Sequence, residues 1–415
     1  MIQTRRDPAT IFVRGLGTAE GLEWGVWLAL TVFWIVDLDL SPARLALLGV
    51  VLEASVLLSE TPTGVVADVY SRRRSVIVAQ FLMGVSFIWM FSTTNFWIVL
   101  PAQALLGFGW TFRSGSDTAW LTDEIRGDSG VDDNDALERL FLRKHRWGIA
   151  LSLVVGPATI AIGWFQTVRI VGIAIGVAYI VLAGWLGLMM TENHFVPARE
   201  RGKGMVQTFR DGISVVRSAP RLRVLVLVAL LFSLGVDVFD RLGYVHFLDS
   251  AGLQDVNQSG ESLLVLGVLF FVLALGGLVI NRVAQGYLDS GKGVARLVAA
   301  LLVVAALGGF IAAATSIVVV IGLGFLLQDS VREALLPVVE SWTNRDAPTE
   351  VRATVHSLVG QTHSVGQIGG AVVFGAVAEA TSIPTAMFGA VVAFGLAAVF
   401  ATRGAQLSED EVATP

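Results

Sequence analysis

The sequence lacks cysteine entirely and has little charge. Without a cysteine among its 415 residues, the chain can form neither a disulfide framework nor a thiolate metal site. Asp, Glu, Lys and Arg make up 15% of the chain and hydrophobic residues 54%, whereas a typical soluble chain is about 25% charged. These values exclude an ordinary cytosolic protein.

The sequence also lacks the local patterns of common enzyme classes. Its five histidines show no metal-ligand spacing, and we find neither a phosphate-binding glycine loop nor a nucleophile elbow. We therefore expect no metal, no cofactor, no enzymatic activity and no nucleic-acid partner. No polar linker divides the chain, and one soluble core stops growing at about 250–300 residues. With a mean hydropathy of +0.70, this much apolar sequence needs lipid as its solvent.

Long apolar runs fill most of the chain. A helix needs about 20 mostly apolar residues to cross the hydrocarbon of a bilayer, and we count twelve such runs. They predict an all-α polytopic membrane protein with twelve transmembrane helices. Arg5 and Arg6 precede the first run, as in a signal peptide, but no convincing cleavage site follows, so we expect a retained helix. The expected spans are 11–36, 44–67, 75–93, 96–120, 147–165, 168–190, 222–247, 262–283, 294–314, 316–341, 357–379 and 384–402.

Basic residues predict the orientation, because loops rich in Lys and Arg stay in the cytoplasm. They cluster after the second span, before the fifth, and between the sixth and seventh, whereas the alternate loops hold chiefly Arg44 and Arg169. We therefore expect both termini in the cytoplasm and the chain in a prokaryotic inner membrane. The clustered residues are Arg72, Arg73, Arg74, Arg139, Arg143, Lys144, Arg146, Arg199, Arg201, Lys203, Arg210, Arg217, Arg221 and Arg223.

The two halves of the chain resemble each other. "GFGWTFRSGSDTAWL" (107–121) aligns with "GLGFLLQDSVREALL" (322–336) at an offset of 215, and "HRWGIALSLVV" (145–155) aligns with "HSVGQIGGAVV" (363–373) at an offset of 218. Two matches at nearly one offset predict two six-helix pseudo-repeats, and parallel repeats of this kind place a substrate site between the halves. The expected parts are a bundle at 1–190, a central loop at 191–221, a second bundle at 222–403 and a cytoplasmic tail at 404–415.

The central loop contains apolar residues at helical spacing with basic residues between them. Met205, Phe209, Ile213 and Val216 form this pattern, which favours an amphipathic helix on the inner membrane surface. A plain solvated linker is the alternative.

The stretch "GVVADVYSRRR" (64–74) lies where the second span is expected to reach the cytoplasm. A glycine lets two helices approach closely, an aspartate can face the positive N-terminal end of a neighbouring helix, and arginines can pair with acids of nearby spans. The anchor residues are Gly64, Asp68, Arg72 and Arg73. A basic stop signal that only fixes the topology is the alternative interpretation.

This stretch resembles the loop signature of the major facilitator superfamily. Its four anchors match, whereas Val69 and Ser71 stand where the family usually has a basic residue and a glycine. The resemblance covers the whole chain through the span count, the duplication and the central loop. It implies the major facilitator fold, transport, and a cytoplasmic gate in which the arginines pair with an acid at the end of span four. Asp123 is the matching candidate for that acid.

Further stretches resemble one subgroup of that family. "SETPTGVVAD" and "SGSDTAWLTDE" are similar to segments of bacterial drug:proton antiporters, and "GPATIA", which begins with Gly156 and Pro157, resembles part of the antiporter signature. Ile160 and Ala161 replace the usual glycine pair of that signature, and Gln103 stands where proton-coupled relatives often have an arginine. The resemblance implies drug efflux in exchange for protons.

Charged residues inside the predicted spans are candidates for function, because a charge at the bilayer centre costs about 2.5–3.5 kcal/mol. Some of them can be neutralised along their own helix. These local pairs are Arg113 with Asp117, Asp237 with Arg241, and Arg332 with Glu333.

Two acids in "GTAEGLEWGVW", Glu20 and Glu23, have no basic residue within a turn of their own helix. At about 100° per residue, they share a stripe with Trp27, Thr31 and Trp34. A second stripe suits close packing against a neighbouring helix, and it consists of Gly17, Gly21 and Gly25. The residues that match Glu20, Glu23, Trp24 and Trp27 in the second half, at an offset of 217, are Asp237, Asp240, Arg241 and Tyr244.

We predict that one of these acids carries a coupled proton, because burial disfavours the charged form of a carboxyl. Glu23 lies nearest to the middle of its span and is the first candidate, with Glu53 next. Simple pairing of Glu20 and Glu23 with arginines such as Arg113 or Arg241 is the alternative. The candidates for proton coupling are Glu23, Glu20, Glu53, Asp237 and Asp240.

Several tryptophans fall deep within the predicted spans. They suit either ordinary packing or an apolar, aromatic pocket for lipophilic or cationic organic substrates. The predicted cavity residues are Trp24, Trp27, Trp34, Trp110, Arg113, Arg241, Tyr244 and Gln328.

The sequence thus favours a monomeric secondary transporter that exports a small lipophilic or antibiotic-like molecule by alternating access, in exchange for protons. A proton-coupled importer or facilitator of a small polar nutrient is the alternative. A membrane receptor without transport is a third interpretation.

Overall fold

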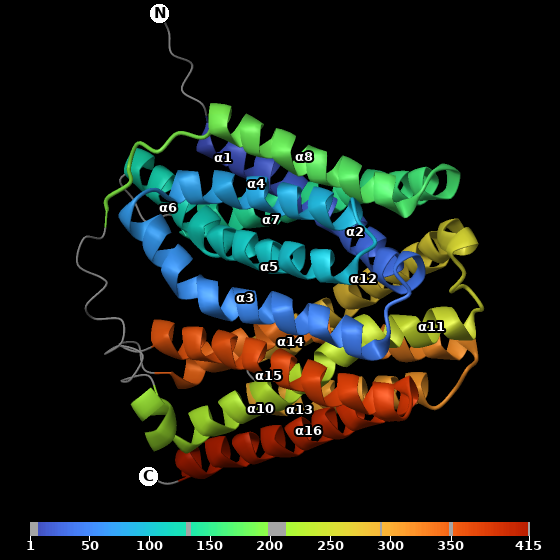
Figure 1. Ribbon diagram of the computed structural model, residues 1–415. Helices are drawn as coiled ribbons and strands as arrows, with labels where there is room; N and C mark the ends of the chain where they lie inside the picture. Colours follow the sequence, from blue (N-terminus) through green and yellow to red (C-terminus); the bar gives the residue numbers. More distant parts are fainter. Residues whose placement is uncertain (1–6, 130–133, 198–212, 291–292, 348–351, 414–415) are drawn as a thin grey trace, which may run out of the picture. The chain divides into compact units, whose positions relative to one another are not determined.

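The computed structural model describes residues 7–129, 134–197, 213–290, 293–347 and 352–413, and every regular element of this part is a helix (Figure 1). The first half contains α1 (Pro8–Ile11), η1 (Phe12–Leu16), α2 (Gly17–Val32), η2 (Phe33–Asp37), α3 (Pro42–Val69), α4 (Arg72–Phe91), α5 (Phe96–Arg113), α6 (Ser116–Ser129), α7 (Asn134–Phe165) and α8 (Val168–Met189). The second half contains α10 (Pro220–Asp237), η3 (Val238–Gly243), α11 (Tyr244–Ser250), η4 (Val256–Gln258), α12 (Ser259–Asp289), α13 (Val294–Ala313), α14 (Val318–Asp346), α15 (Arg352–Ala380) and α16 (Ile383–Ala413). The short elements η1, η2 and η3 are π-helical turns.

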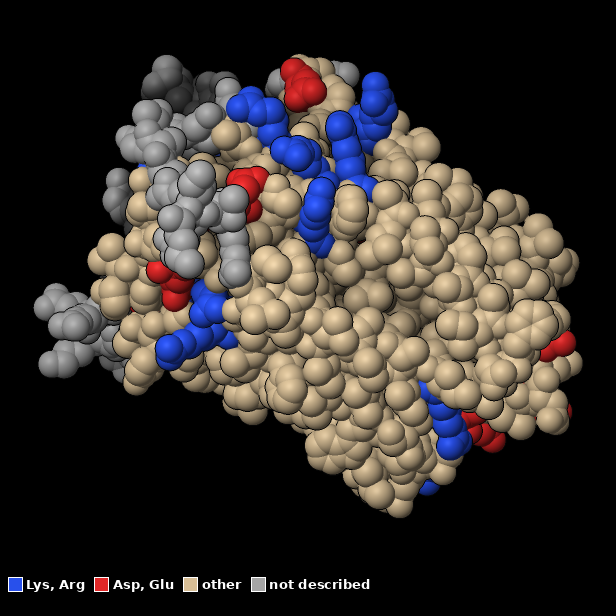
Figure 2. All heavy atoms as spheres, turned by 90° about the horizontal axis from the view of Figure 1, so that it is seen from above, with Lys and Arg blue, Asp and Glu red and all other residues tan. Residues whose placement is uncertain are grey.

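Every predicted span overlaps one of these helices, so the predicted all-α architecture is confirmed. In the described part of the chain, nine helices are long and apolar enough to cross a membrane. The other predicted spans coincide with α5 and α6, with α14 and with α15, which carry more polar residues. On the face that Figure 2 shows, a wide uncharged surface separates most of the Lys and Arg side chains from the few charges at the opposite end. Such a surface suits contact with lipid.

One predicted span, 96–120, is wrong as a single helix. The chain breaks between Arg113, the last residue of α5, and Ser116, the first residue of α6. At the break, Gly115 has a φ of 73°, a left-handed conformation that glycine adopts without the steric cost of a Cβ. The residues from Arg113 to Thr118 are all polar or glycine, so the apolar run ends where α5 ends, and the predicted span extended too far.

The predicted helix of the central loop falls mostly outside the described residues. Met205 and Phe209 lie in that undescribed stretch, whereas residues 213–218 are helical and Val216 is buried. The amphipathic surface helix therefore stays a prediction.

The helices form two compact units. Unit 1 consists of Met1–Asp39, Ala54–Gly202 and Gln254–Gly267, and unit 2 consists of Leu40–Glu53, Lys203–Leu253 and Val268–Pro415. Two helices are therefore divided: α3 passes from unit 2 to unit 1 after Glu53, and α12 passes from unit 1 to unit 2 after Gly267.

The two units repeat the same helix packing. In unit 1, α2 packs against α7 and α8, and α4 packs against α5 and α8. In unit 2, α10 packs against α15 and α16, and α13 packs against α14 and α16. In each half, the first span thus packs against the fifth and sixth spans, and the third span packs against the fourth and sixth. The predicted duplication into two six-helix pseudo-repeats is confirmed.

The glycine stripe of the first span packs against α7, as predicted. A Cβ at Gly17 would lie 2.8 Å from the Lys144 carbonyl oxygen, and one at Gly21 would lie 2.7 Å from Leu151 Cβ. Neither helix has room for a further side chain there. In unit 2 the glycines lie on the opposite partner, because a Cβ at Gly366 of α15 would lie 2.9 Å from the Leu230 carbonyl oxygen of α10. Both bundles thus bring their first and fifth spans close together.

Candidate functional site

Unit 1 contains an ion pair inside its spans. Arg113, the last residue of α5, donates to Glu23 of α2, and their side chains are 16% and 20% exposed. The Arg113 guanidinium also lies 4.4 Å from the centroid of the Trp110 ring. Arg113 makes its direct ion pair with Glu23 and not with the predicted Asp117, which lies beyond the break at Gly115 and acts on the guanidinium only as a further nearby charge. Asp117 instead accepts a hydrogen bond from the Thr118 backbone N–H at 2.7 Å.

Glu20, one turn before Glu23, has different partners. Its carboxylate lies 2.5 Å from His145 Nδ1 and 3.6 Å from Lys144 Nζ, both on α7. Trp24 lies against the same helix, because a Cβ at Gly156 would overlap with its ring. The two acids of the predicted stripe therefore contact different helices.

The other aromatic candidates of the first span lie together. The Trp27 and Trp34 rings meet edge to face, with centroids 6.5 Å apart. Trp34 is 5% exposed, and Thr31 donates to the Trp27 carbonyl at 2.9 Å. Pro157, next to Gly156 in the antiporter-like stretch, is exposed.

Unit 2 contains a larger cluster of charges on η3 and α14. Arg241 lies 2.7 Å from Asp237 of α10, which confirms that local pair, and both side chains are less than 10% exposed. Arg332 of α14 lies 2.6 Å from Asp240, 3.0 Å from Asp329 and 3.1 Å from Glu333. Tyr244, one turn after Asp240, stacks on Phe325 with ring centroids 5.6 Å apart.

The charges of this cluster do not balance. Asp240 interacts electrostatically with four other charged groups of the cluster, of which two are carboxylates and two are guanidinium groups. With every group ionised, three carboxylates face two guanidinium groups, which leaves a formal charge of −1. Glu333, 53% exposed, adds a further acid at the edge. An uncompensated charge inside a membrane is costly. The excess negative charge therefore favours protonation of one carboxylate of the cluster.

A chain of hydrogen bonds leads to Glu53 in unit 2. The Gln367 amide lies with its nitrogen 2.8 Å from Glu53 Oε1 and its oxygen 3.2 Å from His363 Nε2. Ser233 of α10 contacts His363 Nδ1 on the other side of the ring. The Ser233 hydroxyl also lies 2.7 Å from the Ala229 carbonyl oxygen, to which it donates, so its contact with His363 depends on which ring nitrogen carries the proton. The aligned histidines of the two halves, His145 and His363, thus each contact the first span of their own unit.

The motif residues at the end of α3 form a compact cluster in unit 1. Arg72 contacts Asp68 at 3.2 Å and donates to Asp123 and to the Ala119 carbonyl. Asp123 therefore pairs with Arg72, as the resemblance implied. Arg73 donates to the Gly187 carbonyl at 2.6 Å, so the two arginines hold α4 against α6 and α8.

Two acids that the sequence reasoning missed complete this cluster. Glu192 accepts from the Ser71 hydroxyl at 2.5 Å and from the Arg73 backbone N–H at 2.9 Å. Glu124 is 1% exposed and accepts from the backbone N–H groups of Asn193 and His194 at 2.7 and 3.1 Å. These bonds fix the chain after α8 against the start of α4 and against α6.

The close helix approach expected at Gly64 stays a prediction. A Cβ at this position would meet no described atom within 4 Å, so no contact within unit 1 requires the glycine. Ser71, which replaces the family's usual glycine, has an extended backbone and accepts from the Arg74 backbone N–H. A serine there caps α4, which gives the substitution a local structural role.

Comparison with known proteins identifies the architecture. No family model matches the sequence. The chain is 21% identical over 388 residues to YxaM of Bacillus subtilis (strain 168), described as an uncharacterized MFS-type transporter, with 90% of each chain covered. The nucleoside transporter NupG superposes with a TM-score of 0.73 at 14% identity, over 96% of this chain and 98% of that chain. A bacterial homologue of the human lysosomal transporter Spinster, inward-facing and unoccupied, gives 0.68 at 15% identity, over 97% and 98%. A POT family transporter in complex with 5-aminolevulinic acid gives 0.71 at 11% identity, over 95% and 96%.

The chain has the major facilitator fold.

The repeat of the major facilitator fold places equivalent residues in unequal roles. Each unit has an ion pair between its first and fourth spans, Glu23 with Arg113 and Asp240 with Arg332. At the offset of 215, however, the residue that matches Arg113 is Gln328, and Arg332 lies one turn later. Gln328 is 1% exposed, and neither atom of its amide has a hydrogen-bond partner in the described part of the chain. An amide of this kind is available to a ligand or to water.

Glu60 is a further acid that the sequence reasoning missed. It lies on α3, in a helix long and apolar enough to span a membrane, and it is exposed. Among the described residues, no ion pair or hydrogen bond of its carboxylate is found. The signal was its place within "SETPTGVVAD", a stretch that the resemblance had already singled out.

Proposed function

We propose that the chain is a proton-coupled secondary transporter of a small organic molecule. The observation that carries this proposal is the excess carboxylate in the cluster of Asp237, Asp240, Asp329, Arg241 and Arg332. A secondary transporter needs a group inside the membrane that changes its charge during the transport cycle, and a cluster with one acid too many has such a group.

The contacts of Arg332 support a mechanism for that change. Asp240 and Asp329 both lie within 3.0 Å of the same guanidinium. When one of them takes a proton, Arg332 keeps the other as its partner, so protonation leaves no unpaired buried charge. In unit 1, by contrast, Glu23 and Arg113 form a balanced pair, and protonating Glu23 leaves Arg113 without its partner. Asp240 and Asp329 therefore replace Glu23 as the first candidates for the coupled proton.

Export of a lipophilic or antibiotic-like molecule is the first candidate for the direction and the substrate class. Aromatic rings lie beside the charges in each unit: Trp110 lies against Arg113, and Tyr244, on which Phe325 stacks, lies near Asp240. Aromatic faces next to fixed charges suit an organic molecule that carries both rings and a charge. A single chain in a bacterial inner membrane, with both termini in the cytoplasm, goes with this proposal.

Import of a polar nutrient is the second candidate. Two proteins with similar structures favour it: one is a nucleoside transporter, and the other is a POT family transporter in complex with 5-aminolevulinic acid. The unpartnered amide of Gln328 also suits a polar ligand.

Transport in proteoliposomes with an imposed pH gradient tests both candidates. A panel of lipophilic cations and antibiotics is compared with a panel of nucleosides, amino acids and short peptides. Movement of the first panel against its gradient, opposite to the proton flow, supports export. Accumulation of the second panel together with protons overturns it in favour of import. If neither panel responds to the pH gradient although purified protein binds a member of it, the proposal of proton coupling is wrong.

A further inference from the structure

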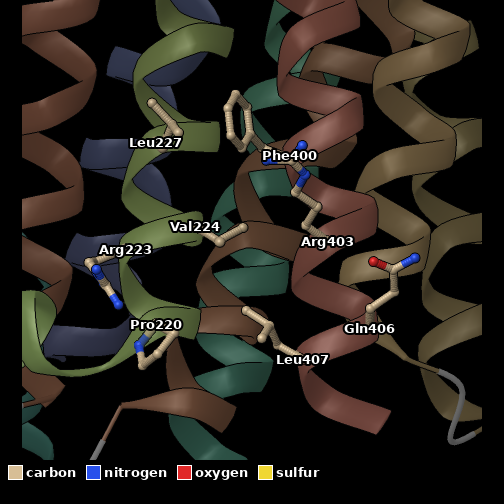
Figure 3. Close-up of a pocket in the computed structure, with 8 residues that line it drawn as sticks. All are labelled: Pro220, Arg223, Val224, Leu227, Phe400, Arg403, Gln406 and Leu407. Carbon is tan, nitrogen blue, oxygen red and sulfur yellow. The ribbon is translucent and has the colours of Figure 1, made fainter. Parts of the chain in front are cut away.

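A groove in unit 2 lies between α10 and α16, at the ends of two candidate membrane spans. Its volume is about 470 Å³. The residues that line it are Pro220, Arg223, Val224 and Leu227 of α10 and Phe400, Arg403, Gln406 and Leu407 of α16 (Figure 3). The candidate spans are Pro220–Ser250 and Ile383–Leu407. One span begins in the groove and the other ends in it, so the groove lies where hydrocarbon meets the polar headgroups.

The groove combines two cations with an apolar floor. Arg223 and Arg403 are both exposed, and in Figure 3 they lie on either side of Val224. Leu227 and Phe400 line the part of the groove that points into the span, and the Arg403 guanidinium lies 5.4 Å from the centroid of the Phe400 ring. No acid is among the residues that line it. The groove therefore offers one cation, Arg223, near its Pro220 end and a second, Arg403, whose guanidinium lies beside the apolar ring of Phe400.

A third arginine, Arg221, lies next to the groove but is not among the residues that line it. Arg221 donates to the Leu407 carbonyl at 3.0 Å and so ties the start of α10 to the end of this span of α16. This bond holds the two walls in place, which leaves Arg223 and Arg403 as the cations that face an occupant.

We propose that this groove binds an anionic phospholipid, with its phosphate between Arg223 and Arg403 and an acyl chain along Val224, Leu227 and Phe400. Basic pockets between transmembrane helices bind anionic headgroups in this way, and long arginine side chains reach the headgroup level from within a span. A soluble anion would make no contact with the apolar floor, and a neutral lipid would leave the charges of the two arginines without a counter-charge. The proposal concerns a lipid site on the outside of unit 2 and does not depend on transport.

The test compares lipid binding by the full-length protein and two double variants. Native mass spectrometry or a thermal-shift titration measures the affinity of the purified chain for phosphatidylglycerol and for phosphatidylcholine. We expect the wild type to prefer phosphatidylglycerol, and R223Q/R403Q to lose roughly 5-fold in affinity per arginine, or roughly 30-fold in all. The matched control, R143Q/R146Q, removes two exposed arginines of α7 and should retain the wild-type affinity.

Three results would overturn the proposal. The first is an unchanged preference for phosphatidylglycerol in R223Q/R403Q. The second is an equal loss in R143Q/R146Q, which would mean that the total positive charge attracts the lipid and no particular site does. The third is full competition by glycerol phosphate at the concentration of the lipid, which would identify the occupant as a soluble phosphate.

Discussion

Arg332 Nη1 lies 2.6 Å from Asp240 Oδ2, and this pair joins residues that are 92 positions apart in the sequence. The same guanidinium lies 3.0 Å from Asp329. One arginine thus holds two carboxylates, whereas Arg113 in the other unit holds one, Glu23. This difference between the two halves decides which acid can exchange a proton without leaving a charge unpaired.

Asp240→Asn should abolish proton-driven transport and leave substrate exchange intact. The asparagine keeps the shape of the side chain but cannot release a proton, while Arg332 keeps Asp329 as its partner. The measurement is substrate accumulation in proteoliposomes with an imposed pH gradient, beside counterflow without a gradient. Asp249→Asn, on the exposed end of α11, is the matched control and should transport like the wild type. Uphill transport at the wild-type level in Asp240→Asn would remove this residue from the coupling mechanism.

Removing both partners of the Glu23–Arg113 pair should cost less stability than the two single removals together. Either Glu23→Gln or Arg113→Gln leaves a partly buried charge without its partner, which costs about 3 kcal/mol in typical buried pairs. The double variant leaves no such charge, so its loss of stability should be smaller than the sum of the two single losses. Thermal unfolding of the four proteins in one detergent measures this coupling. Additive losses would show that the two side chains do not stabilise each other.

Gly21→Ala should weaken the packing of α2 against α7. The new Cβ would lie 2.7 Å from Leu151 Cβ and 3.0 Å from the Gly148 carbonyl oxygen, so one helix must shift, at a cost of about 1–3 kcal/mol. Gly184→Ala is the matched control, because its Cβ would meet no described atom within 4 Å. That variant should be as stable as the wild type or more stable by roughly 0.4–1 kcal/mol. Equal melting temperatures of the two variants would contradict the close approach.

Glu124→Gln should loosen the chain that follows α8. The buried carboxylate accepts from the backbone N–H groups of Asn193 and His194, and a neutral acceptor in its place weakens these bonds by about 1–3 kcal/mol. Limited proteolysis should then cleave near residues 191–194 faster than in the wild type. The exposed Glu138→Gln on α7 is the control. Identical cleavage rates in both variants would mean that Glu124 does not hold this segment.

The sequence predicted the helices well because hydropathy is a local property. Apart from the break within 96–120, the spans, the duplication and the glycine stripe of the first span could be read from composition and period alone. The partner of an acid is not local in the same way. Arg113 was expected to pair with Asp117, four residues later. The helix breaks at the left-handed Gly115 between them, and Arg113 pairs with Glu23 of α2 instead.

Two of the acids that the sequence reasoning missed, Glu124 and Glu192, acquire their role from contacts that the fold creates, such as the Glu192 carboxylate against the start of α4. Asp329 differs, because it pairs with Arg332 three residues on along the same helix. In the sequence all three look like ordinary acids near span ends or beside an arginine. The repeat offers one clue, because it sets Asp329 and Gln328 of the second half against Ser114 and Arg113 of the first, so the fourth spans of the two halves differ where their charges lie.

The π-helical turn Val238–Gly243 sets the direction in which Asp240 leaves its helix. A turn of this kind contains one residue more than an α-helical turn, and Asp240 lies within it. Deleting a single residue such as Val238 would restore the regular helix and rotate Asp240 by about 100° relative to α10, away from Arg332, with every charged side chain still present in the sequence. The pairing of these two residues therefore depends on the length of the chain as much as on its chemistry.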